Sequence, residues 1–201
     1  MKNEKVNGLL LEALETELGG VQIYETALRC AMNEDLKEEW QKYLEQTRNH
    51  VSTLENVCKE LGIDPTEETA GRKIVRHIGA SLVQAMSMAQ QNGNREAAEV
   101  VAAECVTLAE TKDHLNWELI CEVAKNSKGD EKETLQEAFE EIEEEEDEHL
   151  YHTKGWTREL HLQGLGLKAV LPPPEEKKDV KTAIGAERAK NARTKMVSKA
   201  R

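Results

Sequence analysis

Residues 135–163 read LQEAFEEIEEEEDEHLYHTKGWTRELHLQ, and this stretch decides the fold class. Its apolar side chains recur at the three- and four-residue spacing of an amphipathic helix. That apolar line consists of Leu135, Ala138, Phe139, Ile142, Trp156 and Leu160. Glu146 and His149 fall inside the line, about 30° either side of its centre when each residue turns the helix by about 100°. An ionisable pair on the buried side of a helix needs a physical reason, because burying an unpaired charge is costly.

Helical spacing extends over most of the chain that precedes this stretch. We expect long helices over about residues 4–32, 33–61, 95–126 and 130–163, with a shorter helix over about 72–91. The four prolines, Pro65 and residues 172–174, lie outside all of them. Two hairpins of long helices joined by a connector with its own helix predict an all-α protein, a four-helix bundle with one long crossover.

The C-terminal segment differs in charge from the rest of the chain. The net charge is −12, yet residues 175–201 hold nine Lys/Arg against four Asp/Glu. We therefore predict a helical bundle over residues 1–165 and a Pro-containing basic arm over 166–201 that is extended, disordered alone or laid against a neighbour. The acidic body attracts cations and repels nucleic acid, and no aromatic residues separate the basic residues of the arm. We do not expect a nucleic-acid partner.

The cysteines and the apolar content bear on location. The four cysteines, Cys30, Cys58, Cys105 and Cys121, form no CxxC pair, so we expect small buried thiols in a reducing compartment rather than a zinc knuckle or a redox dithiol. The N-terminal residues lack the apolar stretch of a secretory signal, and no apolar run approaches membrane-spanning length. We therefore expect a cytoplasmic protein without a membrane partner.

The spacing Glu146-x-x-His149 places both side chains on one face of a helix. A carboxylate and an imidazole at this spacing can hold one metal ion together, which suits Fe, Mn or Zn. The competing interpretation is a solvated face, because residues 141–148 form an acidic run and such runs usually face water. We accept the solvated face for most of the run, and the metal site for the pair that lies on the apolar line.

The first two long helices each supply one further candidate ligand. Glu17 lies on the apolar stripe of the first helix, and Tyr24 follows one heptad later. Tyr24 is interpreted either as a hydrogen-bond donor to a ligand or as a core-edge tyrosine whose hydroxyl reaches water. His50 lies on the flank of the second helix's apolar line, as a ligand or as a hydrogen-bonded core histidine. Thr47 occupies the position three residues before it.

The helix over residues 95–126 offers two candidates, and two criteria disagree about them. Glu104 lies within the stripe formed by Ala97, Val101, Leu108, Leu115 and Leu119, whereas Glu110 lies on the opposite side. If the chain reverses near residue 128, the level of residues 146–149 matches about residue 109, which favours Glu110. We give the face more weight than the register and predict Glu104.

These residues resemble the ferritin-like superfamily, the di-metal carboxylate proteins that include bacterioferritins and rubrerythrins. The likeness covers residues 8–163 in topology and rests on Glu17 with Tyr24, Thr47-Arg-Asn-His50, Glu104 and Glu146-Asp-Glu-His149. In that family, a Glu from each of two helices and a Glu-x-x-His from each of two others bind two iron or manganese ions.

Carried over to this chain, the resemblance implies that Glu17 and His50 serve one ion and that Glu104 and His149 serve the other. Glu146 would bridge them. Thr47 stands where the second bridging Glu belongs, so the resemblance implies one or two ions of iron or manganese per chain.

Two functions follow as expectations. The first is a metal-dependent oxidoreductase or iron-handling protein in which bound Fe(II) is oxidised by O2 or peroxide. The second is a non-catalytic stress or scaffold protein with a degenerate metal site, bound to partners through its basic tail. We also expect a homodimer or higher homo-oligomer, because such bundles commonly pack side by side. His152 is expected to support the site from outside the ligand set, and Trp156 to pack in the core.

Overall fold

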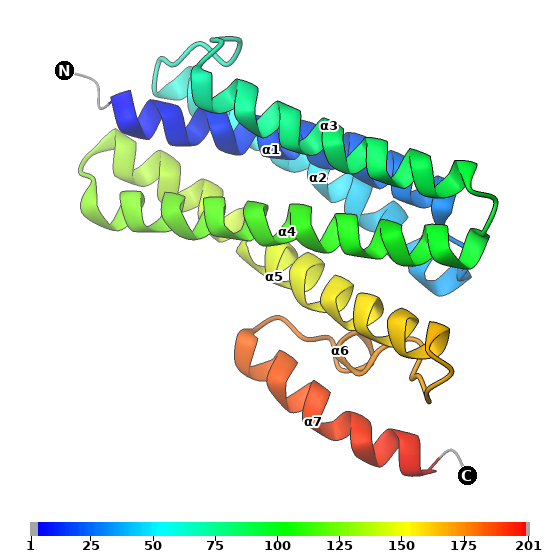
Figure 1. Ribbon diagram of the computed structural model, residues 1–201. Coiled ribbons are helices and arrows are strands. Elements are labelled where there is room, and N and C mark those ends of the chain that lie inside the picture. Colours follow the sequence, from blue (N-terminus) through cyan, green and yellow to red (C-terminus); the bar gives the residue numbers. More distant parts are fainter. Residues whose placement is uncertain (1–3, 200–201) are drawn as a thin grey trace.

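The computed structural model describes residues 4–199, and every regular element in that range is a helix (Figure 1). The helices are α1 (Glu4–Cys30), α2 (Glu34–Glu60), α3 (Ala70–Gln91), α4 (Arg95–Asn126), α5 (Asp130–Gly164), α6 (Pro174–Lys177) and α7 (Ala183–Lys199). The all-α prediction is confirmed. Within this range, no helix combines the length and the apolar character needed to cross a membrane.

Local chemistry explains where the helices begin and end. The side chains of Asn33, Thr69 and Asn94 cap α2, α3 and α4, each accepting a hydrogen bond from a backbone N–H of the first turn. The turns before α4 and α5 contain Gly93 and Gly129 with φ of 75° and 60°, a conformation that glycine adopts without strain. These residues are local signals, which is why the sequence predicts the helix boundaries closely.

The four longest helices contact one another in a closed ring. Helix α1 packs against α2 and α4, and α5 packs against both of those. Helix α3 lies outside the ring, along α1 and α4, while α6 and α7 lie beside α5 (Figure 1). This order brings residues from the start and the end of the chain to one interior.

The apolar core is divided into two clusters. One cluster contains Tyr24, Trp40, Tyr43 and Trp156 near one end of the ring, and the other contains Leu10, Leu54, Trp117, Ile120 and Leu135 near the opposite end. All four cysteines are free and buried, as the sequence predicts. The stretches of α1, α2, α4 and α5 between the two clusters carry polar side chains, and these stretches hold the candidate site.

The prediction of an extended basic arm is wrong for residues 183–199, which form α7 and pack against α5 and α6. The anchor is Glu159 of α5, which is completely buried. Its carboxylate accepts hydrogen bonds from Arg193 Nε at 2.6 Å and from the backbone N–H of Val170 at 2.8 Å. The tail therefore pairs with acidic groups of its own chain.

Replacing Glu159 with Ala is expected to release this tail, because the change removes the carboxylate that accepts from Arg193 Nε and from the Val170 amide and leaves Arg193 only the Lys168 carbonyl. Breaking a buried ion pair by removing one partner costs about 3–5 kcal/mol. Limited proteolysis should therefore cut within residues 165–199 at least tenfold faster. The matched control is Glu187→Ala, since Glu187 is an exposed residue that pairs only within α7. Equal cleavage of both variants would show that the tail is held by other contacts.

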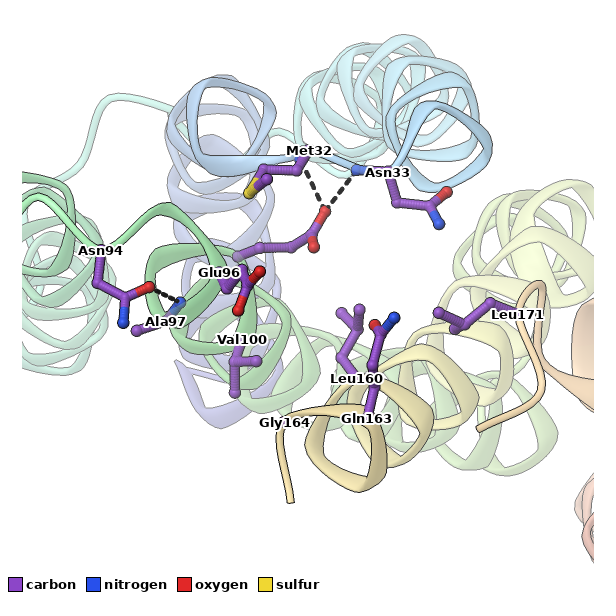
Figure 2. A pocket seen from close by; sticks show the side chains of 11 residues that line it. Met32, Asn33, Asn94, Glu96, Ala97, Val100, Leu160, Gln163, Gly164 and Leu171 are labelled. Atoms are coloured by element: carbon purple, nitrogen blue, oxygen red, sulfur yellow. Dashed lines mark hydrogen bonds between the residues drawn. The ribbon is translucent and has the colours of Figure 1, made fainter. Parts of the chain in front are cut away.

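A hollow of about 650 Å³ lies at the end of the molecule where the α1–α2 turn meets the start of α4 and the end of α5 (Figure 2). Its polar groups serve helix ends. The Glu99 carboxylate accepts from the backbone N–H of Met32 and of Asn33, both at 2.7 Å, and Asn94 caps α4. The residues that line this hollow include no histidine and no cysteine. The metal-ligand chemistry lies elsewhere.

Candidate metal centre

Six ionisable side chains from all four helices of the ring converge between the two apolar clusters. They are Glu17 of α1, His50 of α2, Glu110 and Asp113 of α4, and Glu146 and His149 of α5. None of the six is more than 5% exposed. Four carboxylates and two imidazoles thus share a dry interior, where their charges would repel without a cation.

These side chains form two overlapping groups, each with its ligand atoms close enough together to hold one metal ion. In the first, His50 Nδ1 lies 3.1 Å from Glu146 Oε1 and 3.4 Å from Glu17 Oε1. In the second, His149 Nδ1 lies 3.5 Å from Glu110 Oε2 and 3.7 Å from Glu146 Oε1. Within each group one ligand atom per residue lies within 4.8 Å of the others. Glu146 belongs to both groups and therefore lies between them.

Both histidines turn the same nitrogen toward the interior. His50 Nε2 contacts Glu145 Oε2 at 2.9 Å, and His149 Nε2 contacts Gln46 Oε1 at 3.0 Å. Because both partners are acceptors, Nε2 of each ring donates to them and Nδ1 faces the carboxylates. On His149 this Nδ1 is a free lone pair, whereas on His50 it holds a proton that a metal ion would replace. Metal-binding histidines are oriented in this way, with the second nitrogen donating to a carboxylate or carbonyl oxygen.

Six buried atoms of the cluster have no hydrogen-bond partner. They are Glu17 Oε2, His50 Nδ1, Glu110 Oε2, Asp113 Oδ1, Glu146 Oε2 and His149 Nδ1. Each unsatisfied buried polar atom costs about 1–3 kcal/mol. One bound cation satisfies several of these atoms at once, because each is a carboxylate oxygen or imidazole nitrogen that can act as a metal ligand once it has lost any proton. The donor set therefore fits a metal ion.

Two aromatic donors hold the carboxylates in place. Tyr24 Oη donates to Glu110 Oε1 at 2.8 Å, and Trp117 Nε1 donates to Glu17 Oε1 at 3.0 Å. Each donor occupies one carboxylate oxygen and leaves the other free. Tyr24 is completely buried, so its role as a donor to a candidate ligand replaces the alternative of a core-edge tyrosine.

Burial controls the protonation of the cluster. It raises the pKa of Glu110 and of Glu146 to about 7, and it raises the pKa of Asp113 well above the usual range, with Glu17 adding to the effect. Burial lowers the pKa of His149 to about 4, so this imidazole is neutral at pH 7 and its lone pair is available. Burial also opposes a charge on His50, but Glu17 and Glu145 together hold its pKa well above the usual range. A metal ion must displace that proton.

The structure brings together Glu17, His50, Glu146 and His149, but not Glu104. Glu104 lies at the surface and accepts from His161 Nε2 at 2.8 Å. The prediction that Glu104 faces the interior is therefore wrong, and the register argument for Glu110 is the better guide. The stripe misleads because its large members are exposed, Leu108 by 60%, whereas the face of α4 that packs inward carries small residues such as Ala102, Val106 and Ala109.

Sequence reasoning missed Asp113 entirely. The spacing Glu110-x-x-Asp113 places both carboxylates on one face of α4, and this pair on a face of small residues is the signal that could have found it. Thr47 has no carboxylate and does not act as a ligand. Its hydroxyl donates to the Tyr43 carbonyl of its own helix at 2.8 Å, and its methyl lies against Gly20. The fourth carboxylate of the cluster comes from α4 instead of α2.

His152 is buried but lies outside these two groups, and it contacts Glu39 and Tyr43. Trp156 is fully buried, as expected of a core residue, and its indole N–H donates to Glu39. No protein-family model, curated protein or solved structure matches the chain. Any function must therefore be inferred from the arrangement of these side chains.

Proposed function

We propose that the chain is a ferritin-like four-helix bundle protein that binds two ions of iron or manganese and oxidises Fe(II) with O2 or peroxide. The observation that carries the proposal is the set of buried carboxylate and imidazole atoms without hydrogen-bond partners, including Nδ1 of both His50 and His149. The closed ring of α1, α2, α4 and α5, with α3 in the long connection between α2 and α4, supports the bundle assignment.

In this proposal each ion has its own ligands. Glu17 and His50 hold one ion, Glu110 and His149 hold the other, and Glu146 lies between them. Asp113 supplies the carboxylate that Thr47 cannot supply. The ligand count then equals the four carboxylates and two histidines of the resembling family, with one carboxylate relocated to another helix.

Bound iron supplies the one-electron steps of such a reaction, and the carboxylates favour the oxidised ion. The protein residues orient the ligands, exclude water and exchange protons. Trp117 and Tyr24 keep Glu17 and Glu110 oriented. The apolar clusters above and below exclude water. Because the pKa of Glu110 and of Glu146 is about 7, these groups are able to gain or lose a proton near neutral pH as an ion leaves or arrives.

The scaffold alternative requires a basic tail free to bind partners. Arg193 pairs with Glu159, and Lys181 pairs with Glu144 at 3.2 Å, so the tail already neutralises acidic groups on α5. This observation favours the metal-binding function.

The metal content of variants tests the proposal. Protein loaded with Fe(II) without oxygen, or with Mn(II), should hold at least two ions per chain by elemental analysis. Glu110→Ala, Glu146→Ala and His149→Ala should each lower the content severalfold and abolish Fe(II) oxidation. Glu104→Ala is the matched control, because it removes a Glu from the same helix at an exposed position. Equal metal content in all four variants and wild type would refute the proposal.

A further inference from the structure

Another hollow, of about 440 Å³, opens on the surface where α2, α5 and α6 meet, and we call it the second acidic hollow because of its lining. Six of the nine residues that line it are acidic, which makes it attractive to cations. These are Asp35, Glu38, Glu39, Glu148, Glu176 and Asp179. Acidic clusters are common on surfaces, so the hollow needs a further feature that indicates a ligand.

His152 provides that feature. It lines the hollow and is only 2% exposed, and its Nε2 has no hydrogen-bond partner. Its Nδ1 lies 2.7 Å from Glu39 Oε1 and 3.2 Å from Tyr43 Oη. A buried imidazole nitrogen without a hydrogen-bond partner is costly, so Nε2 of His152 is a second feature of this hollow that calls for a ligand. Glu39, Glu148 and His152 offer ligand atoms within 4.8 Å of one another.

Two carboxyl groups, those of Glu39 and Glu176, meet at this point. The Trp156 indole N–H lies 2.6 Å from both Glu39 Oε2 and Glu176 Oε2, so these two carboxylates share one donor. Glu176 belongs to α6, and the hollow is therefore completed by the docked C-terminal segment. Burial and the nearby Glu39 carboxylate raise the pKa of Glu176 to about 9, so one proton already separates these two groups at pH 7.

We propose that Glu39, Glu148 and His152 form a second binding site for a divalent transition-metal ion, separate from the buried centre and open to solvent. Two carboxylates and an imidazole suit Fe(II), Mn(II) or Zn(II). Tyr43 stands between the two sites. Its hydroxyl contacts Glu39 and His152, and the centroid of its ring lies 4.1 Å from that of the His149 imidazole.

Lys42 is the group that competes with a metal ion. Its ammonium contacts Glu148 and lies 5.6 Å from the centre of the Tyr43 ring. The Lys42 side chain is half exposed and flexible, so it is able to swing into water when an ion arrives. Removing its charge should therefore tighten metal binding, which is an effect that a purely structural role for the cluster does not predict.

Calorimetric titration of the metal-free, full-length protein with Zn(II) tests the site. The variant Glu110→Ala/Glu146→Ala, which lacks the buried centre, should still bind one ion. Adding His152→Ala should weaken that binding at least tenfold. Adding His161→Ala instead should leave it unchanged, because His161 is an exposed α5 histidine paired with Glu104. Lys42→Met in the same background should tighten binding severalfold.

The same comparison in the wild-type background covers the case in which the double variant fails to fold. There, His152→Ala should lower the stoichiometry by one ion, and His161→Ala should not. Equal binding by these two variants would overturn the second site. The outcome is independent of the buried centre, since failure of that centre alone would leave one ion bound to wild type and none to His152→Ala.

Discussion

Replacing Glu146 with Gln is expected to stabilise the metal-free protein at pH 8 and to make the metal-loaded protein less stable than loaded wild type. The first half follows from burial, which raises the pKa of Glu146 to about 7 from the ordinary 4.5. The folded state then keeps a proton that the unfolded state releases. Stability from this group is complete below pH 4.5 and is lost as the pH rises through 7.

The size of this loss is bounded by the shift in pKa. A change from 4.5 to about 7 corresponds to about 3 kcal/mol at pH 8. Gln has no proton to release, so the variant avoids the loss and should gain up to that amount over metal-free wild type. At pH 4.5 the two proteins should be nearly equally stable, since Glu146 is then protonated in the folded state and half protonated in the unfolded state.

Bound metal reverses the order of stability of wild type and the Glu146→Gln variant. Wild type gains about 2.7 kcal/mol when the free ion is at 100 times its Kd, and the Glu146→Gln variant loses most of this gain because an amide is a poor ligand. For a chain of this length, 1 kcal/mol changes Tm by about 2–4 °C. Urea and thermal unfolding with EDTA or with Mn(II), at pH 4.5 and pH 8, measure both effects.

Glu104→Gln is the control for this experiment, because Glu104 is exposed and its partner His161 is nearly half exposed. It should change the free energy of unfolding by less than about 0.5 kcal/mol under every condition. If Glu146→Gln instead destabilised the metal-free protein at pH 8, the carboxylate would be a net structural contact, and the metal-binding role would lose its physical basis.

The helices were predictable because their signals are local. Residues such as Asn33 and Asn94 cap a helix from within a few residues, and apolar spacing is readable in a single window. Glu146 and His149 were predictable for the same reason, since each is an ionisable residue on a line of large apolar side chains. For α4 the apolar pattern pointed to the wrong residue, because the inward face carries small residues while the large leucines face outward, and only the register argument indicated Glu110.

The tail was not predictable, because its partner is distant in sequence. Pro172 to Pro174 and the basic residues after them are typical of an extended arm. Only the folded chain shows that Glu159 is buried at the position where Arg193 of α7 reaches it. The second acidic hollow depends on the same docking, since Glu176 arrives on α6. Contacts of this kind depend on tertiary structure and leave no periodic pattern.

Replacing Asp113 with Asn is expected to lower the number of ions in the buried centre from two to one, and so the total per chain by one. Asp113 Oδ1 is buried without a hydrogen-bond partner, and its charged neighbours are Glu17, Glu110, Glu146 and His50 of the same cluster. Asn keeps the shape of the side chain but is a weaker ligand for iron or manganese. Elemental analysis should show the lost ion, and Fe(II) oxidation should slow by at least about tenfold, as loss of supporting metal contacts commonly causes.

Thr47→Glu provides the complementary test in the Asp113→Asn background. Thr47 lies three residues before His50, on the same face of α2, and is buried against Gly20, which offers no side chain. A Glu at this position should restore the second ion by supplying the missing carboxylate from α2. Asp130→Asn, an exposed change at the start of α5, should keep both ions. If Asp113→Asn alone kept two ions at wild-type affinity, Asp113 would not be a ligand, and the centre would hold its ions with three carboxylates.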